Sequence, residues 1–335
     1  MRPLGMRPLA TLAATVALAV CASACTVAYD DDGEVMPPGQ LSVPAAKHRD
    51  AVDVVVDTDL APDDLVALAY LLRHPGVRVL AVTVPATGMV WCPAGVDIAH
   101  DLMVAVRADP VPISCGSTAR GPHGIPFPAE WSVSAASDSG LERDDEIWTK
   151  TDPTPPAELI GRLAKRHPGL EVVELAPATE LAALLRSDRT AYSRIDRIVA
   201  MTGVVHGPPQ DATAGEWNAA ADPDALAAVL AGPVPVTVVP NEVAPDGSPA
   251  GMRRPVVGGI GVLTAAPPPR FWDLATAAFF THPEAGRTTT GRWSVALTGE
   301  PGRLTRVGDG DDTVVTSLDT KALDAAYRGV FTPER

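Results

Sequence analysis

Four carboxylates crowd a short turn that follows the first apolar strand predicted for the main domain. The run Val52–Val56 ends at Asp57, and Asp59, Asp63 and Asp64 complete a set of four acids within eight residues. Two carboxylates about 4 Å apart repel by about 4 kcal/mol at an effective dielectric of about 20. An oxygen-seeking divalent cation is the natural counter-charge, so the turn predicts a metal site. Solvated and helix-capping acids are the alternative, although a helix dipole would favour only Asp63 and Asp64.

The elements that must position this turn alternate between strands and helices. Apolar, β-branched runs predict strands at residues 52–56, 77–84, 111–114, 170–175, 197–201 and 234–239. Apolar residues at helical spacing predict helices at residues 62–73, 96–107, 156–166, 179–186, 223–230 and 321–327. This alternation indicates a single α/β domain with an open, mostly parallel sheet covered by helices on both faces. Ligands of such sheets bind beyond the carboxyl ends of the strands, which is where the acidic turn lies.

Two further segments stand out along the domain. Residues 116–155 form a long insertion rich in Gly, Pro and Ser, and loops of this length are uncommon unless they cover a site. Residues 292–317 have the pattern of a hairpin, with Gly308-Asp309-Gly310 predicted at its turn.

The composition of the chain excludes several classes of protein. Its 335 residues include 27 basic and 41 acidic ones, for a net charge of −14 and a pI near 4.9. A chain with this net negative charge is not expected to bind nucleic acid or anionic lipid through electrostatic attraction. A hydrophobic fraction of 46% with only 20% charged residues excludes an intrinsically disordered chain.

The first 24 residues have the layout of a secretory signal peptide. Arg2 and Arg7 give a positive start, and an apolar run over residues 9–22 follows. This run is shorter than the roughly 20 residues that a permanent membrane helix needs. We therefore expect residues 1–24 to be removed and the protein to be exported.

The end of this segment indicates how the mature chain is anchored. Ser23-Ala24-Cys25 resembles the end of a bacterial lipoprotein signal, in which the Cys becomes the lipidated N-terminus. We therefore expect a cell-envelope lipoprotein on the outer face of the membrane, attached only through Cys25. The alternative is cleavage near Ala24 followed by free secretion. Residues 25–50 are acidic and rich in Pro and Gly, which predicts a solvated tether before a domain at residues 51–335.

Cys92 and Cys115 are the two cysteines beyond this leader. Oxidising conditions outside the cell permit a disulfide between them. Two reduced, buried thiols are the alternative, because the sequence does not show whether the Cα atoms lie within bonding range.

Short motifs resemble those of the inosine–uridine-preferring nucleoside hydrolases, in the same order along the chain. They are Asp57-Thr58-Asp59-x3-Asp63-Asp64, Leu80–Val84, Pro122-His123-Gly124, Ala176–Ala182, Met201-Thr202-Gly203, Glu216-Trp217-Asn218 with Asp222-Pro223, and Phe271-Trp272-Asp273. The resemblance covers residues 51–330, nearly the whole predicted domain. It implies the family's Rossmann-like α/β core and a hydrolase of N-glycosyl bonds that serves purine and pyrimidine salvage.

The resemblance also implies a calcium centre. Ca²⁺ would be held by the carboxylates of Asp59, Asp64 and Asp273 and by the main-chain carbonyl of Thr179, all of them hard oxygen donors. A Ca²⁺-bound water, deprotonated by Asp59 as general base, would hydrolyse the N-glycosidic bond of a ribonucleoside or related N-riboside to free base and ribose. Asp57 would orient the loop from behind the ligands.

The same resemblance assigns residues to the substrate. Asp63 would bind the ribose 2′-hydroxyl, and Glu216 and Asn218 would hold the 5′ side of the sugar and its 3′-hydroxyl. His123 would face the pocket, with capping of a turn as the alternative. Trp272 would either stack on the nucleobase or pack in the core.

Several positions depart from the family pattern. Met89 stands where an Asn binds ribose, Glu180 and Gln210 also replace Asn, and Trp272 replaces a His that protonates the leaving base in many members. A thioether donates no hydrogen bond, and an indole is no general acid near neutral pH. The metal-binding set is intact while the substrate contacts are altered. The nucleobase and sugar are therefore left open, as is the oligomeric state, a homo-oligomer included.

Two other functions fit part of the sequence. A non-catalytic nucleoside- or sugar-binding lipoprotein on the same fold would account for the altered substrate contacts. A phosphatase of the haloacid dehalogenase type would use Asp57-x-Asp59 after a strand as its nucleophile motif. Such an enzyme also needs a downstream Lys, and no Lys lies between Lys47 and Lys150.

Overall fold

The computed structural model describes residues 28–29, 35–36, 45–137, 139, 141, 151–211, 214–246 and 270–331. The strands are β1 (Ala28–Tyr29), β2 (Val35–Met36), β3 (Val52–Thr58), β4 (Val77–Val84), β5 (Ile113–Cys115), β6 (Glu171–Leu175), β7 (Arg197–Met201), β8 (Val236–Val239), β9 (Gly286–Val295) and β10 (Leu304–Leu318). The helices are α1 (Pro62–Arg73), α2 (Ala94–Ala105), α3 (Ala129–Ser137), α4 (Pro156–Arg166), α5 (Thr179–Ser187), α6 (Arg189–Tyr192), α7 (Trp217–Ala221), α8 (Pro223–Leu230), α10 (Trp272–Thr281) and α11 (Thr320–Phe331). None of the helices within these ranges has both the length and the apolar character of a membrane span.

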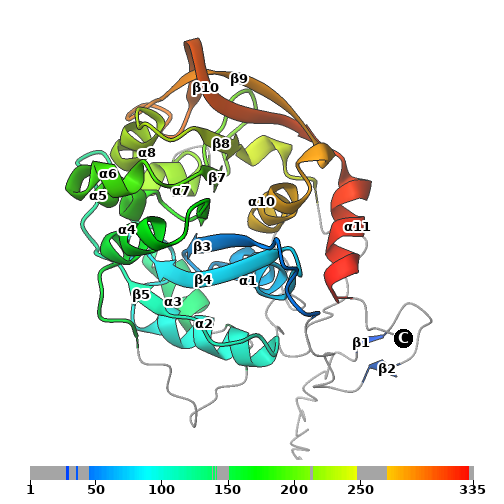
Figure 1. The fold of residues 1–335 in the computed structure, drawn as a ribbon. Coiled ribbons are helices and arrows are strands. Elements are labelled where there is room, and N and C mark those ends of the chain that lie inside the picture. The colour runs from blue at the N-terminus through cyan, green and yellow to red at the C-terminus, as the bar shows by residue number, and fades with distance from the viewer. Residues whose placement is uncertain are drawn as a thin grey trace, which may run out of the picture.

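The centre of the domain is an eight-stranded sheet in the order β5-β4-β3-β6-β7-β8-β10-β9 (Figure 1). All neighbouring strands pair in parallel except β9, which runs antiparallel to β10 at one edge. The prediction of an open, mostly parallel sheet is confirmed. β1 and β2 pair separately as a two-stranded antiparallel sheet within the segment predicted as a tether.

Alternate residues of the central strands pack into two cores, one on each face of the sheet. Val54 and Val56 belong to the core that includes α1, α2, α10 and α11, whereas Val55 belongs to the core that includes α4, α5 and α8 (Figure 1). Burial on both faces explains why these strands are apolar throughout. Because β3 has β4 on one side and β6 on the other, the order of the strands reverses there. Such a reversal opens a crevice beyond the carboxyl ends of the strands.

The carboxyl-terminal hairpin differs from the prediction. Gly308-Asp309-Gly310 lies inside β10, and the chain reverses between β9 and β10 at residues 296–303 instead. The pairing register shifts between Arg306 and Gly308 and again between Gly308 and Asp312, so this stretch is an irregular, bulged part of the strand. The turn prediction is wrong because Gly and Asp are typical of turns and bulges alike.

Cys92 and Cys115 form a disulfide, with Cα atoms 5.9 Å apart. The bridge joins the loop between β4 and α2 to the end of β5. Of the two alternatives that the sequence left open, the structure has the bridge.

Replacing both cysteines by Ser should lower the free energy of unfolding by about 2–4 kcal/mol, because the bridge spans 23 positions and restricts the unfolded chain. Urea unfolding of Cys92→Ser/Cys115→Ser beside the wild type measures the loss. Equal midpoints for the two proteins would show that the bridge does not stabilise the fold.

Candidate active site

Three carboxylates converge where two helices begin. Asp63 and Asp64 lie in the first turn of α1, and Asp273 lies in the first turn of α10, which packs against α1. Each offers a ligand atom within 4.8 Å of the others, and all three side chains are buried. Pro62 begins α1 because its fixed φ suits a first helical position, which places the two acids next. Both helix dipoles favour negative charge here, by about 0.3–1 kcal/mol for each acid.

The cluster contains buried oxygens that lack partners. Asp64 Oδ2 and Asp273 Oδ1 have no hydrogen-bond partner within the part of the chain that the structure describes. Burial raises the pKa of both carboxyls well above the ordinary range, and the neighbouring carboxylates raise it further. The helix dipoles offset only a small part of this cost. Hard carboxylate oxygens at this spacing fit a divalent ion such as Ca²⁺.

Asp59 approaches the same cavity from the end of β3. Its Oδ2 accepts a hydrogen bond from the main-chain N–H of Met89 at 2.8 Å, and its Oδ1 accepts one from Ala61 at 3.3 Å. Leu60 has a positive φ of 57°, a conformation that costs a non-glycine residue about 1–2 kcal/mol, and burial of its side chain holds the turn. Burial raises the pKa of Asp59 to about 7, and nearby carboxylates add to the shift. A buried carboxyl whose pKa is raised, and which lines the cavity, suits a general base.

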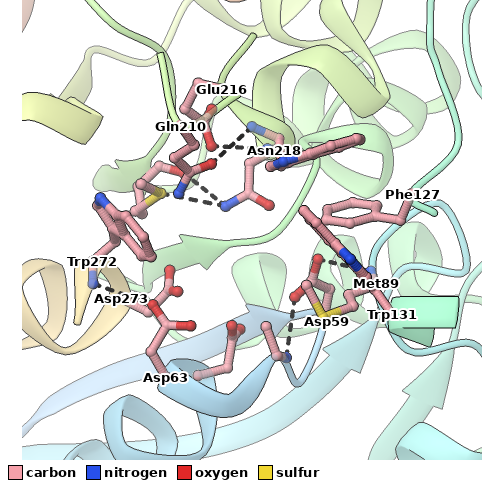
Figure 2. Close-up of a pocket in the computed structure, with 14 residues that line it drawn as sticks. Asp59, Asp63, Met89, Phe127, Trp131, Gln210, Glu216, Asn218, Trp272 and Asp273 are labelled. Carbon is pink, nitrogen blue, oxygen red and sulfur yellow. Dashed lines mark hydrogen bonds between the residues drawn. The ribbon is translucent and has the colours of Figure 1, made fainter. Parts of the chain in front are cut away.

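Glu216 and Asn218 lie across the cavity from these acids. Glu216 caps α7, since its Oε1 accepts the N–H of Asn218 and its Oε2 accepts the N–H of Ala219. Its Oε2 also accepts the N–H of Gly203, just after β7. Asn218 Nδ2 donates to the main-chain carbonyls of Leu175 and Met201, at the ends of β6 and β7. The two side chains therefore tie α7 to the strand ends, and Asn218 reaches into the space above the acids (Figure 2).

All of these groups open onto one cavity of about 290 Å³, near the lower end of the range for small-molecule sites. Trp272 lies on one side of it, and Met89, Phe127 and Trp131 lie on the opposite side (Figure 2). The lining residues are Asp59, Ala61, Asp63, Asp64, Met89, Phe127, Trp131, Met201, Gln210, Glu216, Trp217, Asn218, Trp272 and Asp273. Acids at the base and aromatic rings at the sides suit a sugar joined to a flat, apolar group.

Comparison with known proteins places this chain in a family. A family model described as inosine-uridine preferring nucleoside hydrolase matches residues 54–325. The chain belongs to this family. It is 26% identical to a probable uridine nucleosidase 2 of Oryza sativa subsp. japonica, over 56% of this chain and 55% of that protein. It is also 26% identical to the pyrimidine-specific ribonucleoside hydrolase RihA of Salmonella schwarzengrund, over 58% of this chain and 61% of that protein.

These matches span little more than half the length of the curated relatives. A solved structure, the inosine-uridine preferring nucleoside hydrolase from Bacillus anthracis, is similar over 83% of this chain and 98% of that one, with a TM-score of 0.68 and 21% identity. At that identity the likeness shows the nucleoside hydrolase fold.

Most of the candidate site residues predicted from the sequence line this cavity. Those that line it are Asp59, Asp63, Asp64, Met89, Glu216, Asn218, Trp272 and Asp273. Gln210 lines it as well, and its Oε1 accepts the N–H of Trp217. The main-chain N–H of Trp272 donates to Asp63 Oδ2, which links that acid to the start of α10. The roles of these residues toward an ion or a substrate stay predictions.

Thr179 is not among the residues that line the cavity, and its role as a main-chain carbonyl ligand stays a prediction. It begins α5, and its hydroxyl contacts Thr87 and Asp222. In the preceding strand, the main-chain carbonyl of Leu175 accepts a hydrogen bond from the pocket residue Asn218.

His123 and Asp57 also lie away from the cavity lining. His123 contacts Asp224 through its ring Nδ1 at 2.8 Å and its main-chain N–H at 3.0 Å, so it ties the insertion to α8 instead of facing the pocket. Asp57 is fully buried behind the site and accepts a hydrogen bond from the Thr83 hydroxyl at 2.6 Å. Because Asp57 does not line the cavity, the structure gives no support to its use as the nucleophile of a phosphatase.

Phe127 and Trp131 are pocket residues that the sequence analysis did not single out. Both belong to the insertion at residues 116–155, and Trp131 lies on α3. The expectation that the insertion covers a site is confirmed, but no periodic pattern marks these two positions. Thr58 is a further missed residue, because its hydroxyl donates to Asp64 Oδ1 and fixes that carboxylate.

Proposed function

We propose that this protein hydrolyses the N-glycosidic bond of ribonucleosides or related N-ribosides, in purine or pyrimidine salvage. The observation that carries the proposal is the cavity itself, in which buried acids lie beneath aromatic side chains. Membership in the nucleoside hydrolase family supports the same reaction. So do the names of the relatives, a uridine nucleosidase and a pyrimidine-specific ribonucleoside hydrolase.

Calcium is the ion that we propose for the acidic cluster. Asp63, Asp64 and Asp273 offer oxygens close enough to share one ion, and Asp59 lines the same cavity. When bound, Ca²⁺ would supply a Lewis acid that binds sugar hydroxyls and lowers the pKa of a water. The family motifs give Asp59 to the ion and Asp63 to a sugar hydroxyl. In this chain Asp63 lies close enough to Asp64 and Asp273 to share an ion with them. The carboxylates of Asp59 and Asp63 are therefore both candidate ligands.

Asp59 is the general base of the proposed reaction. Hydrogen bonds from the N–H groups of Met89 and Ala61 hold its carboxylate at the cavity. Asp59 takes one proton from the attacking water while the water oxygen bonds to C1′ of the sugar. The C1′–N bond breaks, its electron pair leaves with the base, and the base nitrogen takes a proton from solvent. The surrounding carboxylates stabilise the positive charge that develops on the sugar.

A sugar-release assay tests the proposal. Purified protein with Ca²⁺ is offered inosine, adenosine, uridine, cytidine and p-nitrophenyl riboside, and free base and ribose are both measured. Equal release of base and ribose from at least one compound is the expected result. Binding of these compounds in calorimetry without any release would indicate a non-catalytic nucleoside- or sugar-binding protein. Neither binding nor release would overturn both functions.

We also propose that the protein is exported and held on the outer face of the cell membrane by a lipid on Cys25, a residue outside the described part of the chain. Cys25→Ala should move most of the protein from the membrane fraction to the medium or block its processing, because the thiol that would carry the lipid is lost. Cell fractionation and mass spectrometry of the mature N-terminus measure this. An unmodified N-terminus on the wild-type protein would indicate simple secretion instead.

A further inference from the structure

Carboxylates and aromatic rings line the same cavity. Five of the lining residues are acids, namely Asp59, Asp63, Asp64, Glu216 and Asp273. Within the part of the chain that the structure describes, no Lys, Arg or His lines the cavity. A divalent ion would offset two of these five negative charges. With its acids ionised, the loaded cavity therefore stays negative and attracts a positively charged group.

Trp272 and Asp59 lie on opposite sides of this cavity (Figure 2). Asp59, the proposed general base, accepts the main-chain N–H of Met89 at 2.8 Å, and Met89 lies across the cavity from Trp272. The main-chain N–H of Trp272 donates to Asp63 Oδ2 at 3.2 Å, so the indole stands next to the acids. In a direct displacement, water adds to one face of C1′ while the base leaves from the other. A water held by Asp59 therefore sends the base toward Trp272.

The charge of the base decides whether its departure needs a proton. A neutral base keeps the electron pair of the C1′–N bond and must then be protonated, and the indole of Trp272 is no general acid near neutral pH. A base that is bonded through a positively charged ring nitrogen keeps the same electron pair and leaves as a neutral molecule. Before it leaves, such a ring is attracted to the face of an indole, the aromatic side chain that binds cations best.

We infer that the preferred substrates are N-ribosides with a cationic base, in which the ring nitrogen bonded to C1′ carries the positive charge, as in a pyridinium riboside. This inference rests on the proposed hydrolysis and names its substrate class. Asp59 takes one proton from water, the water oxygen bonds to C1′, and the electron pair of the C1′–N bond neutralises the ring nitrogen. The carboxylates and the Trp272 ring both favour binding of the charged substrate.

Two ribosides that differ in charge test the inference. Nicotinamide riboside has a cationic ring, and its dihydro form has a neutral ring of nearly the same size on the same sugar. Kd is measured by calorimetry on the Asp59→Asn protein with Ca²⁺, in which slow hydrolysis leaves both compounds intact, and kcat/KM is measured on the wild type. We expect the cationic compound to bind about 10-fold more tightly or better, and to have the higher kcat/KM.

Substitutions of Trp272 in the Asp59→Asn protein show whether its ring causes this preference. Trp272→Leu keeps an apolar side chain but removes the ring, and should lower the ratio of the two Kd values about 2- to 30-fold, which corresponds to a cation–π contact of about 0.5–2 kcal/mol. Trp272→Phe should keep part of the preference. Trp91 is the matched control, since it is 41% exposed and does not line the cavity, and Trp91→Leu should keep the whole preference.

The outcomes separate this inference from the proposed function. Equal or weaker binding of the cationic riboside would overturn the inference and leave the hydrolysis intact. An unchanged preference in Trp272→Leu would overturn it as well, because the indole would then not hold the cation. Failure of the wild type to release base from any nucleoside or riboside would overturn the proposed function instead, and the ratio of the two Kd values would still decide which charge the cavity prefers.

Discussion

Asp59→Asn is expected to lower kcat for nucleoside hydrolysis by at least about 10²-fold, since general-base catalysis contributes about 10²–10⁴-fold. An amide keeps the shape of the side chain but is a far weaker base than a carboxylate. The amide oxygen can still accept the hydrogen bond from Met89, so the turn after β3 should keep its conformation. Base release at saturating nucleoside measures kcat separately from KM.

Asp309→Asn is the matched control for this variant. Its carboxylate is fully exposed on β10 and does not line the cavity, so kcat and KM should both stay at the wild-type values. A wild-type kcat in Asp59→Asn would show that another group takes the proton from water. A melting temperature close to that of the wild type is the condition for assigning the loss to chemistry.

The elements that the sequence predicted most closely are those with strong boundary residues. α4 begins at Pro156 and α8 begins at Pro223, and both helices have the predicted bounds. Proline suits the first helical turn and disfavours the helical conformation in the residue before it, which marks the start. The turn predicted at residues 308–310 failed because the same residue types form bulges, and only the pairing with β9 distinguishes the two.

Site residues could be predicted from the sequence where neighbours in the chain lie together. They could not be predicted where the packing of distant elements brings them together. Asp63 and Asp64 are neighbours in the chain, whereas Asp273 joins them because α10 packs on α1. Only the family resemblance, and no spacing rule, could connect that third acid. Phe127 and Trp131 were missed for the same reason, because the fold and not a repeat in the sequence brings the insertion over the cavity.

Chelation of Ca²⁺ is expected to lower the melting temperature by about 5 °C or more. An ion at about 100 times its dissociation constant stabilises the folded state by about 2.7 kcal/mol, and about 1 kcal/mol shifts the melting temperature of a large domain by about 2–4 °C. Without the ion, the buried carboxylates of Asp63, Asp64 and Asp273 lie close together and repel one another. Thermal unfolding in excess chelator, followed by titration with Ca²⁺ and separately with Mg²⁺, measures the shift and its ion preference.

Asp64→Asn separates the ion from any general effect of the chelator. The amide oxygen can still accept the Thr58 hydroxyl, while one negative charge leaves the cluster. This variant should lose the Ca²⁺-dependent shift and, in chelator, melt at or above the chelated wild type, because repulsion is relieved. Asp309→Asn should keep the whole shift. An unchanged wild-type melting temperature in chelator, with no metal in the purified protein, would contradict the ion site. The cluster would then hold protons in place of an ion, consistent with the raised pKa of Asp64 and Asp273.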